Sequence, residues 1–522
     1  MTGLKQQSCF GGRLARRLTA LAGVLVLAAC TPVPLDAPKL VTRAVIAPAT
    51  ASLQQSAGIL SRGRHPAHSS LIPMVEGNEA LGARLRIMEA AEHTIDLQYF
   101  LMKQDLAGAL ISQGMLDAAD RGVRVRLLLD DIFTTVPDDT LALLDAHQNI
   151  EVRVFNPAMR PAPKMLGLLA EFPRVNRRMQ NKSFTADGAV AIVGGRNIAD
   201  EYYQIQTDSE FADFEVSIIG PAVRGIEETF DLFWNDGWSV PMERLNEAPS
   251  AAEVAAARTN LDLRLRDARQ IYEKAVSNPH FQRLISGSEP IYDARIEVET
   301  DIPDKVKVPV RGGGPRILAE DLLNRMQNAS HSVVLMTPYF VPEDYGAQLF
   351  QRLAERGVDV RIITNSVGST NHSYVHAGYH RHRASLLASG VELFEIRSDA
   401  LQAMGRLPAD DERGLVMHTK LAVIDRDEIF VGSLNLDPRS VKLNTEGGIF
   451  IHSHQFGGFV HDEIDREIRN FTYRLSLADD GALRWHYDNP VSPSVTSQEP
   501  GATLFNQTII GITGLLGLEL QL

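Results

Sequence analysis

The sequence predicts an α/β protein built from a duplicated unit, and three observations support this. The chain has 522 residues, 44% of them hydrophobic and 22% charged, a globular composition long enough for more than one core. Several segments occur twice in the same order, about 240 residues apart, which is the period of a duplicated domain. Amphipathic helical stretches such as Ala107–Asp120 are followed by short β-branched runs such as Val123–Leu129. This alternation is typical of layered α/β folds.

The repeated segments define the extent of the two units. Thr94–Phe100 resembles Val334–Phe340, and Arg121–Leu127 resembles Arg356–Ile362. With an offset of 238 residues, Lys182, Asp187, Gly194 and Asn197 recur as Lys420, Asp425, Gly432 and Asn435. We therefore predict a first unit over residues 71–245, a helical connector over 246–290, a second unit over 291–480 and a C-terminal tail over 481–522.

The first 29 residues have the features of an export signal. Basic residues precede the short apolar run Leu18–Ala29, which is shorter than the roughly 20 residues of a membrane span. The run ends in Leu27-Ala28-Ala29-Cys30, which resembles a bacterial lipobox and implies cleavage before Cys30 and acylation of its sulfur. An ordinary signal peptide with a chance cysteine is the alternative. Residues 30–70, proline-rich and without sustained periodicity, are predicted to be a tether.

Charge and cysteine content exclude some classes of partner and site. The formal net charge of −13 argues against a nucleic-acid partner, because phosphates require Lys and Arg. The chain has 2 cysteines, Cys9 and Cys30, too few for a disulfide framework or a cysteine-rich metal site.

The second unit carries a pattern suited to chemistry on a phosphate. His418 and Lys420 are two residues apart, so on a strand they point to the same face. An ammonium group can hold phosphate oxygens while the neighbouring imidazole attacks or passes a proton. Ser433 and Asn435 can donate further hydrogen bonds, and Glu446 could accept one from the far imidazole nitrogen and orient the ring.

These motifs resemble the phospholipase D superfamily. His418-x-Lys420-x4-Asp425 followed by Gly432-Ser433-x-Asn435 is similar to its signature, and the flanking sequences resemble the cardiolipin synthase C-like branch. The resemblance implies two units packed around one shared active site, no cofactor or metal, a phosphatidylglycerol-like phospholipid substrate and a membrane as partner. It implies that one histidine becomes phosphorylated while the other protonates the leaving alcohol. With the lipobox, it places the protein in the bacterial cell envelope, anchored through Cys30 and facing the periplasm.

The first unit departs from the pattern at Gln180. A glutamine amide is neither a nucleophile nor a base near neutral pH. It can still bond a phosphate oxygen or Glu215, the expected partner of the missing histidine. Lys182, Lys420, Asn197 and Asn435 are expected to hold the phosphate whether or not turnover survives.

Three interpretations stay open at this stage. The protein is a phosphatidyltransferase that uses a route through His418, an active enzyme that tolerates Gln180, or a catalytically impaired phospholipid-binding relative. A phosphodiesterase or nuclease is a weaker candidate.

The remaining candidates carry smaller expectations. Asp187 and Asp425 lie before turns, so we expect them to bond turn backbone rather than substrate. Arginines 174, 177, 178 and 196 could hold an anionic head group or could be structural, and histidines 372, 376, 380 and 382 lack the carboxylate or cysteine complement of a metal site. The apolar segment Phe505–Leu522 is expected to pack on the protein or lie in a membrane interface.

Overall fold

The computed structural model describes residues 33–160, 171–205, 208–278, 283, 288–308, 315–370, 372, 374–503, 506 and 508. The expected signal peptide, Cys30 and nearly all of the C-terminal apolar segment lie outside these residues. Within the described residues, no helix is both long enough and apolar enough for a membrane span.

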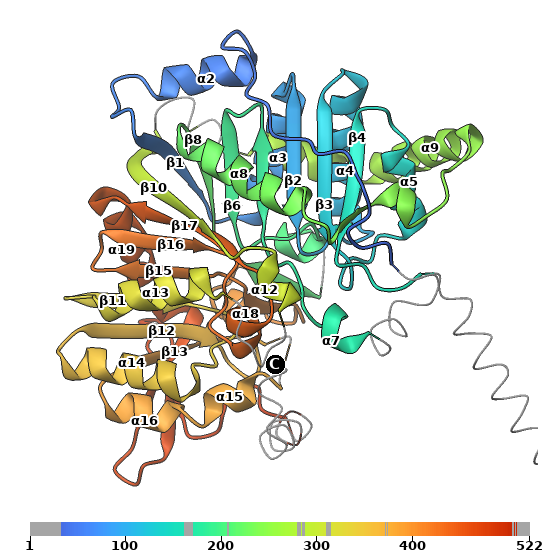
Figure 1. Cartoon of the computed structure of the whole chain (residues 1–522). Helices are drawn as coiled ribbons and strands as arrows, with labels where there is room; N and C mark the ends of the chain where they lie inside the picture. Colours follow the sequence, from blue (N-terminus) through green and yellow to red (C-terminus); the bar gives the residue numbers. More distant parts are fainter. Residues whose placement is uncertain are drawn as a thin grey trace, which may run out of the picture.

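An 18-stranded sheet runs through both units (Figure 1). Across its first half the strands are β9 (Ser239–Pro241), β4 (Ile150–Phe155), β3 (Arg124–Asp130), β2 (Thr94–Tyr99), β5 (Ser183–Ala186), β6 (Val190–Gly194), β8 (Glu215–Ile219) and β1 (His68–Met74). The second half continues with β10 (Tyr292–Thr300), β17 (Gly447–His452), β16 (Glu428–Gly432), β15 (Leu421–Ile424), β11 (Ser332–Met336), β12 (Asp359–Asn365), β13 (Glu392–Ile396), β18 (Thr472–Leu477), β19 (Leu483–Tyr487) and β20 (Ser494–Thr496).

The two halves mirror each other about the antiparallel pair β1 and β10, in which Leu71 lies opposite Tyr292. In each half, three parallel strands (β2, β3 and β4; β11, β12 and β13) lie beyond an antiparallel hairpin, and the first strand of that hairpin consists of the four residues between the signature lysine and aspartate. The predicted α/β duplication is therefore confirmed.

Helices flank the sheet in both units (Figure 1). The first unit contains α3 (Gly77–Ala90), α4 (Leu106–Asp120), α5 (Asp138–Asp145), α7 (Phe172–Val175) and α8 (Ala222–Trp234), with short 3-10 turns η1 (Asp200–Tyr202) and η2 (Met242–Arg244). The second contains α12 (Asp304–Lys307), α13 (Ile317–Gln327), α14 (Glu343–Glu355), α15 (His376–His380), α16 (Arg383–Ala388), α17 (Ala400–Ala403), α18 (Pro438–Lys442) and α19 (His454–Phe471). The connector forms α9 (Ala251–Asp267), which begins at a capping box of Ser250 and Glu253, and α10 (Arg269–Val276).

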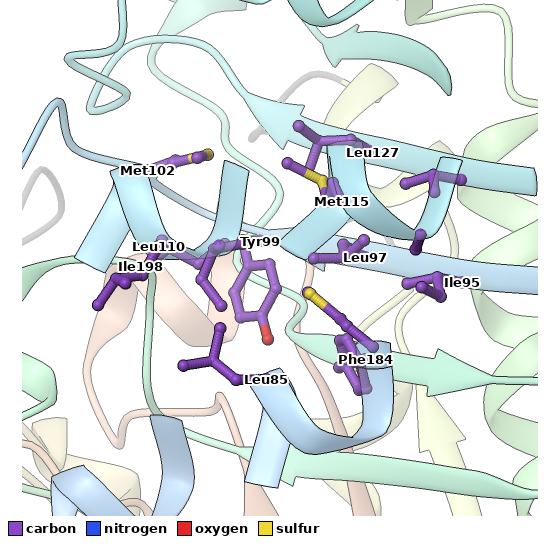
Figure 2. Close-up of a cluster of buried hydrophobic side chains, with 14 of the residues drawn as sticks. Leu85, Ile95, Leu97, Tyr99, Met102, Leu110, Met115, Leu127, Phe184 and Ile198 are labelled. Atoms are coloured by element: carbon purple, nitrogen blue, oxygen red, sulfur yellow. The ribbon is translucent and has the colours of Figure 1, made fainter. Parts of the chain in front are cut away.

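Each unit has its own hydrophobic core, and a further cluster joins the two. Figure 2 shows the first core, where Leu97 from β2 and Leu127 from β3 meet Leu85 from α3 and Met115 from α4. Full burial of such a side chain stabilises the fold by about 1.5–3 kcal/mol. These cores hold the loops at the strand ends in fixed positions.

The predicted tether is wrong from residue 33 onward. Trp234 Nε1 donates to Thr42 Oγ1 (2.8 Å), and Lys39 Nζ donates to the carbonyl of Ser239 (2.6 Å). Ala47 and Ala51 are buried, α2 (Ser52–Leu60) follows, and β1 begins at residue 68. The prolines that suggested a linker instead belong to an extended segment that lies against the first unit.

The predicted tail is also structured at its beginning. The strands β19 and β20 extend the sheet of the second unit beyond residue 480. Glu499 then accepts a hydrogen bond from the buried Arg383 (2.7 Å), which fixes the following chain against α16.

Candidate active site

The two signature segments lie where each unit is bonded to the other. A small parallel sheet pairs β7 (Ser209–Ala212) of the first unit with β14 (Gly414–Met417) of the second. Directly after it, the N–H of His418 donates to the carbonyl of Ala212 (2.7 Å). The same arrangement occurs in the other direction, where the N–H of Gln180 donates to Thr445 (2.9 Å). One site is therefore assembled from both halves.

His418 and Lys420 do not lie on a strand, as the sequence had suggested. They belong to the extended segment between β14 and β15, and both still come together. Lys420 Nζ lies 3.1 Å from Nε2 of His418 and donates to the carbonyl of His418 (2.6 Å). The predicted juxtaposition of imidazole and ammonium is thus present in this connecting segment.

The partner that orients His418 is Asp213. Its Oδ2 lies 2.7 Å from Nδ1 of the imidazole, and the carboxylate is fully buried. The expectation that Glu446 would take this role is wrong, because the acceptor comes from the other unit. The ring of His418 also stacks on Phe211, with centroids 5.7 Å apart, and meets Tyr202 edge-on at 5.1 Å. The ring is therefore held by a hydrogen bond to Asp213 and by contacts with two aromatic side chains.

Burial and neighbouring charges set the protonation states around His418. Burial, and then the ammonium of Lys420, lowers the pKa of His418 to about 4, so the imidazole is neutral at pH 7. Burial also lowers the pKa of Lys420 to about 7. Burial alone would raise the pKa of Asp213, but His418 and Lys420 bring it below its usual value. An ionised Asp213 accepts from Nδ1–H, so Nε2, beside Lys420 Nζ, is the unprotonated nitrogen of the ring.

Glu446 occupies the position in the second unit that Asp213 occupies in the first. Each directly follows the residue whose carbonyl accepts from the signature segment of the other unit. Oε2 of Glu446 accepts from Ser433 Oγ (2.5 Å), while its buried Oε1 has no partner of ordinary hydrogen-bond geometry in the described residues. Burial raises the pKa of Glu446 to about 8, against the attraction of Lys182. Glu446 is thus the counterpart, for the segment that carries Gln180, of Asp213 for the segment that carries His418.

Glu215 has a different role from the one predicted. Its two oxygens accept from NH1 and NH2 of Arg84 at 2.9 and 2.6 Å, and Arg196 lies 3.5 Å away. All three side chains are buried. Glu215 is therefore part of a structural ion-pair cluster and is not the partner of position 180.

The expected phosphate-holding groups are buried on both sides of the site. Lys182 Nζ donates to the carbonyl of Gln180 (2.7 Å) and lies 5.5 Å from the ring centroid of Phe100. Burial lowers the pKa of Lys182 to about 8. The amides of Asn197 and Asn435 donate to Tyr202 (3.0 Å) and Ser440 (3.4 Å). The carbonyl oxygen of each amide is buried and has no partner in the described residues.

Asp187 and Asp425 are placed away from this chemistry. Each accepts from three consecutive backbone N–H groups, those of residues 92–94 and 330–332, at 2.7–2.9 Å. Both adopt positive φ, at 55° and 52°. They anchor the turn of the hairpin to the start of β2 and β11.

The arginines near the first signature bond protein groups. Arg178 pairs with Asp130 (3.0 Å), Arg196 donates to the carbonyl of Asp213 (2.7 Å), Arg174 pairs with Glu171 (2.7 Å) and Arg177 donates to the carbonyl of Val306 (3.1 Å). Arg178 and Arg196 are fully buried, which favours structural roles for this pair. The hydrogen bond from Arg196 to the carbonyl of Asp213 also helps to hold Asp213 in place.

Of the four histidines considered for a metal site, three bond other protein groups and His372 packs against Tyr339 (ring centroids 5.6 Å apart). His376 and His380 lie 3.4 and 3.7 Å from Glu499, and His382 accepts from Arg381 (3.1 Å). None of the four belongs to the group His461, Asp462 and Asp465, which the described residues offer as possible metal ligands.

Asp213 was the functional residue that the sequence analysis missed. Asp213 and Glu446 are 233 residues apart, whereas Lys182 and Lys420 are 238 apart, so a constant offset does not connect the two carboxylates. The strand register does, because Gly194 pairs with Glu215 and Gly432 with Gly448, which brings residues 213 and 446 to equivalent positions.

Comparisons with known proteins agree with this geometry. The sequence profile described as "Cardiolipin synthase, PLD-like domain" matches residues 85–234 and 322–469. The chain is 34% identical over 466 residues to cardiolipin synthase C of Escherichia coli (strain K12), covering 87% of this chain and 97% of that one. It is 25% identical over 380 residues to a cardiolipin synthase of Clostridium perfringens, covering 73% and 66%.

A solved structure shares the fold. The phosphatidylserine synthase of Haemophilus influenzae Rd KW20 has a TM-score of 0.57 and 14% sequence identity, covering 90% of this chain and 100% of that chain. The profile falls inside each of the two units, and the relative from Escherichia coli spans nearly the whole chain. The chain therefore belongs to the cardiolipin synthase family of phospholipase D-like proteins, with the family domain present in two copies.

Proposed function

We propose that this protein is a phosphatidyltransferase of the cardiolipin synthase type in which His418 is the nucleophile. The observation that carries the proposal is the array of Asp213, His418 and Lys420 at the junction of the units, with contacts of 2.7 and 3.1 Å. Asp213 fixes the tautomer, and Lys420 supplies positive charge where phosphate oxygens would lie. The names of the relatives support a phospholipid as the substrate class.

The reaction would proceed in two displacements. Nε2 of His418 attacks the phosphorus of a donor such as phosphatidylglycerol, a P–N bond forms, and the P–O bond to the head-group alcohol breaks with its electron pair. The leaving oxygen takes a proton. An acceptor alcohol then loses a proton, attacks the phosphohistidine and releases His418 unchanged. No oxidant, reductant or cofactor enters this exchange.

Proton transfer must be supplied without a second histidine. Gln180 cannot carry a proton near neutral pH. We assign this transfer to Lys182 and Lys420, whose pKa values of about 8 and about 7 allow both protonation states near neutrality.

A second candidate function rests on Gln180 itself. The position that the family fills with histidine is held by an amide, although Glu446, the counterpart of Asp213, is present and Lys182 bonds the carbonyl of Gln180. Such a site would bind the phosphate of a phospholipid but would catalyse its transfer only slowly.

One assay separates the two functions. Phosphatidyl transfer from phosphatidylglycerol is measured for the present sequence, for Gln180→His, and for Gln180→His combined with His418→Ala. Activity in the present sequence, raised by Gln180→His and absent in the double variant, is the expected result. No transfer by any of the three folded proteins, with phospholipid binding retained, would instead establish the binding function.

We further propose that the protein is lipid-anchored through Cys30 in a bacterial envelope. The support is the lipobox-like sequence before Cys30. Cys30→Ser should abolish acylation and leave a precursor of different mobility in the membrane fraction. Unchanged processing and membrane attachment would refute the anchor.

A further inference from the structure

A cavity of about 450 Å³ lies behind the segment that carries His418. Leu415, Met417, Thr419 and Leu421 line it, and they alternate along the chain with His418 and Lys420. Successive side chains of an extended chain point to opposite faces, so the cavity and the phosphate-holding groups lie on opposite sides of this segment. Its volume is in the range of small-molecule sites.

The interior of the cavity is apolar and is built from both units. Helix α19 presents Val460, Ile464, Ile468 and Phe471 to it, three or four residues apart on one helical face. Facing them are buried side chains of the sheet, among them Ile363 and Ile396 of β12 and β13, while Phe211 and Phe214 contribute from the first unit. Three of the four α19 side chains are only half-buried, so an apolar occupant would remove their exposed surface from water.

The mouth of the cavity is acidic. The lining includes the carboxylates of Glu76, Glu79, Glu210, Glu463 and Glu467, together with a single arginine, Arg406. The amide of Gln204 donates to Glu76 (2.7 Å) and Glu210 (2.8 Å), which joins two carboxylates without neutralising them. Two of the lining acids are paired with arginines outside the lining: Glu289 with Arg283 (2.5 Å) and Glu463 with Arg466 (2.7 Å).

One of these acids is itself perturbed by the site. Burial, and then the charge of Glu76, raises the pKa of Glu79 to about 7. A cation near Glu79 and Glu76 would relieve this repulsion, whereas an anion would add to it.

We propose that this cavity binds an amphiphile that has an apolar chain and a cationic head group. The chain would fill the space between α19 and the sheet, and the head group would lie among the carboxylates at the mouth. Charge complementarity favours a cationic head group, because an anionic lipid would bring a negative charge close to these carboxylates. Asp213, the partner of His418, and Phe211, which stacks on His418, also line the cavity, so it adjoins the active site on the side opposite the phosphate-holding groups. The proposed binding does not depend on the proposed transferase activity.

The C-terminal segment of the chain is the alternative occupant. Residues 509–518 are apolar and uncharged, and the charge that follows them is the acid Glu519. That segment would fill the apolar interior but would offer nothing to the acidic mouth, so the amphiphile fits the lining better.

The test is a calorimetric titration of the full chain with hexadecyltrimethylammonium below its micellar concentration, compared with hexadecyl sulfate. We expect saturable binding of the cation at one site and at least tenfold weaker binding of the sulfate. Ile464→Trp fills the cavity and should abolish binding. Glu467→Lys reverses a charge at the mouth and should weaken binding roughly tenfold.

Asp479→Lys is the matched charge reversal at an exposed position away from the lining and should leave binding unchanged. If Ile464→Trp fails to fold, as judged by circular dichroism, the affinity of Glu467→Lys for the cationic amphiphile still tests the proposal. Equal binding of both amphiphiles, or wild-type binding by both cavity variants, would overturn the proposal. So would binding that is absent in the present sequence and gained by Leu515→Asp, because the C-terminal segment would then be the occupant.

Discussion

At the scale of single residues, the site depends on which carboxylate faces which signature residue. Asp213 bonds His418 across the junction of the units, and Glu215, two residues further along the chain, bonds Arg84. Adjacent positions on the same face of one chain thus have separate roles, one orienting a reactive ring and the other stabilising the fold.

Asp213→Asn should lower transfer by roughly 10²–10⁴-fold, because the neutral amide no longer fixes the tautomer of His418. Stability should change little, since the amide keeps the shape of the carboxylate. Steady-state transfer assays and thermal unfolding measure both effects.

Glu215→Gln is the matched comparison. Removing one charge from a buried ion pair should cost about 3–5 kcal/mol of stability. Activity per folded molecule should be retained at a temperature where the variant is folded. If Glu215→Gln lost transfer selectively and Asp213→Asn did not, the assignment of the two carboxylates would be reversed.

The pKa values predict the pH dependence of kcat/KM for transfer. As pH falls through about 4, His418 gains a proton and loses its nucleophilic lone pair, so activity should fall. As pH rises past about 7 to 8, Lys420 and Lys182 lose their charge, so phosphate binding and proton supply should fall as well. Lys420→Arg, which stays charged, should keep phosphate binding at high pH. A profile that rises steadily to pH 10 would contradict this assignment.

The site was predictable from sequence to the extent that local spacing determines it. His418 and Lys420 are two residues apart, and their juxtaposition follows from backbone geometry alone. Asp213 is 205 residues from His418, and the contact exists because β7 of one unit pairs with β14 of the other. Such a long-range pairing leaves no local sequence pattern, and the shifted offset between Asp213 and Glu446 removed the repeat as a guide.

At the scale of structural elements, each hairpin after a signature is fixed by one aspartate. Asp187 and Asp425 accept three backbone N–H groups apiece at the entry to β2 and β11, and both have a left-handed backbone conformation. These bonds align the hairpin with the parallel strands and so position the lysine that precedes it.

Asp425→Ala should therefore destabilise the protein by roughly 2 kcal/mol or more, because it removes the acceptors and places alanine at positive φ. Asp425→Asn should cost less, since asparagine tolerates this conformation and keeps one acceptor oxygen. Denaturant unfolding gives the free energies. Loss of transfer in a variant of wild-type stability would show that Asp425 acts in the chemistry instead.

The segment before β1 shows where composition misled the prediction. Prolines and low periodicity in residues 33–51 indicated a tether, yet Thr42 and Lys39 bond the first unit. An extended segment that packs through backbone and polar contacts has no hydrophobic period to detect. In contrast, the connector was predictable because α9 has a strong helical composition.

At the scale of the whole molecule, one continuous sheet contains both copies of the duplicated unit, and the single site lies where the two copies meet. The repeats in the sequence were enough to predict paired units, because each half repeats the order of strands about β1 and β10. The continuity of the sheet across that pair could not be predicted from sequence, since β1 and β10 carry no motif.

The shared site predicts that Lys182 and Lys420 hold the same phosphate although they come from different units. Changing either to Met should weaken binding of a phosphate analogue such as vanadate by about 1.5–3 kcal/mol, which is roughly 10- to 150-fold. Lys103→Met, on the surface beside Glu201, is the control and should bind normally. An effect confined to one of the two site lysines would mean that the halves do not share the ligand.

The most direct test of the account is to trap the covalent intermediate. The unsubstituted protein is mixed with phosphatidylglycerol, and the reaction is quenched in alkali because phosphohistidine is stable there. The protein is then analysed by peptide mass spectrometry. The account predicts a phosphatidyl adduct on His418, or the glycerophosphoryl adduct that remains when alkali removes the acyl chains, that is absent in His418→Ala and strongly reduced in Asp213→Asn. Measurable transfer with no adduct on His418, or with the adduct on another residue, would contradict it.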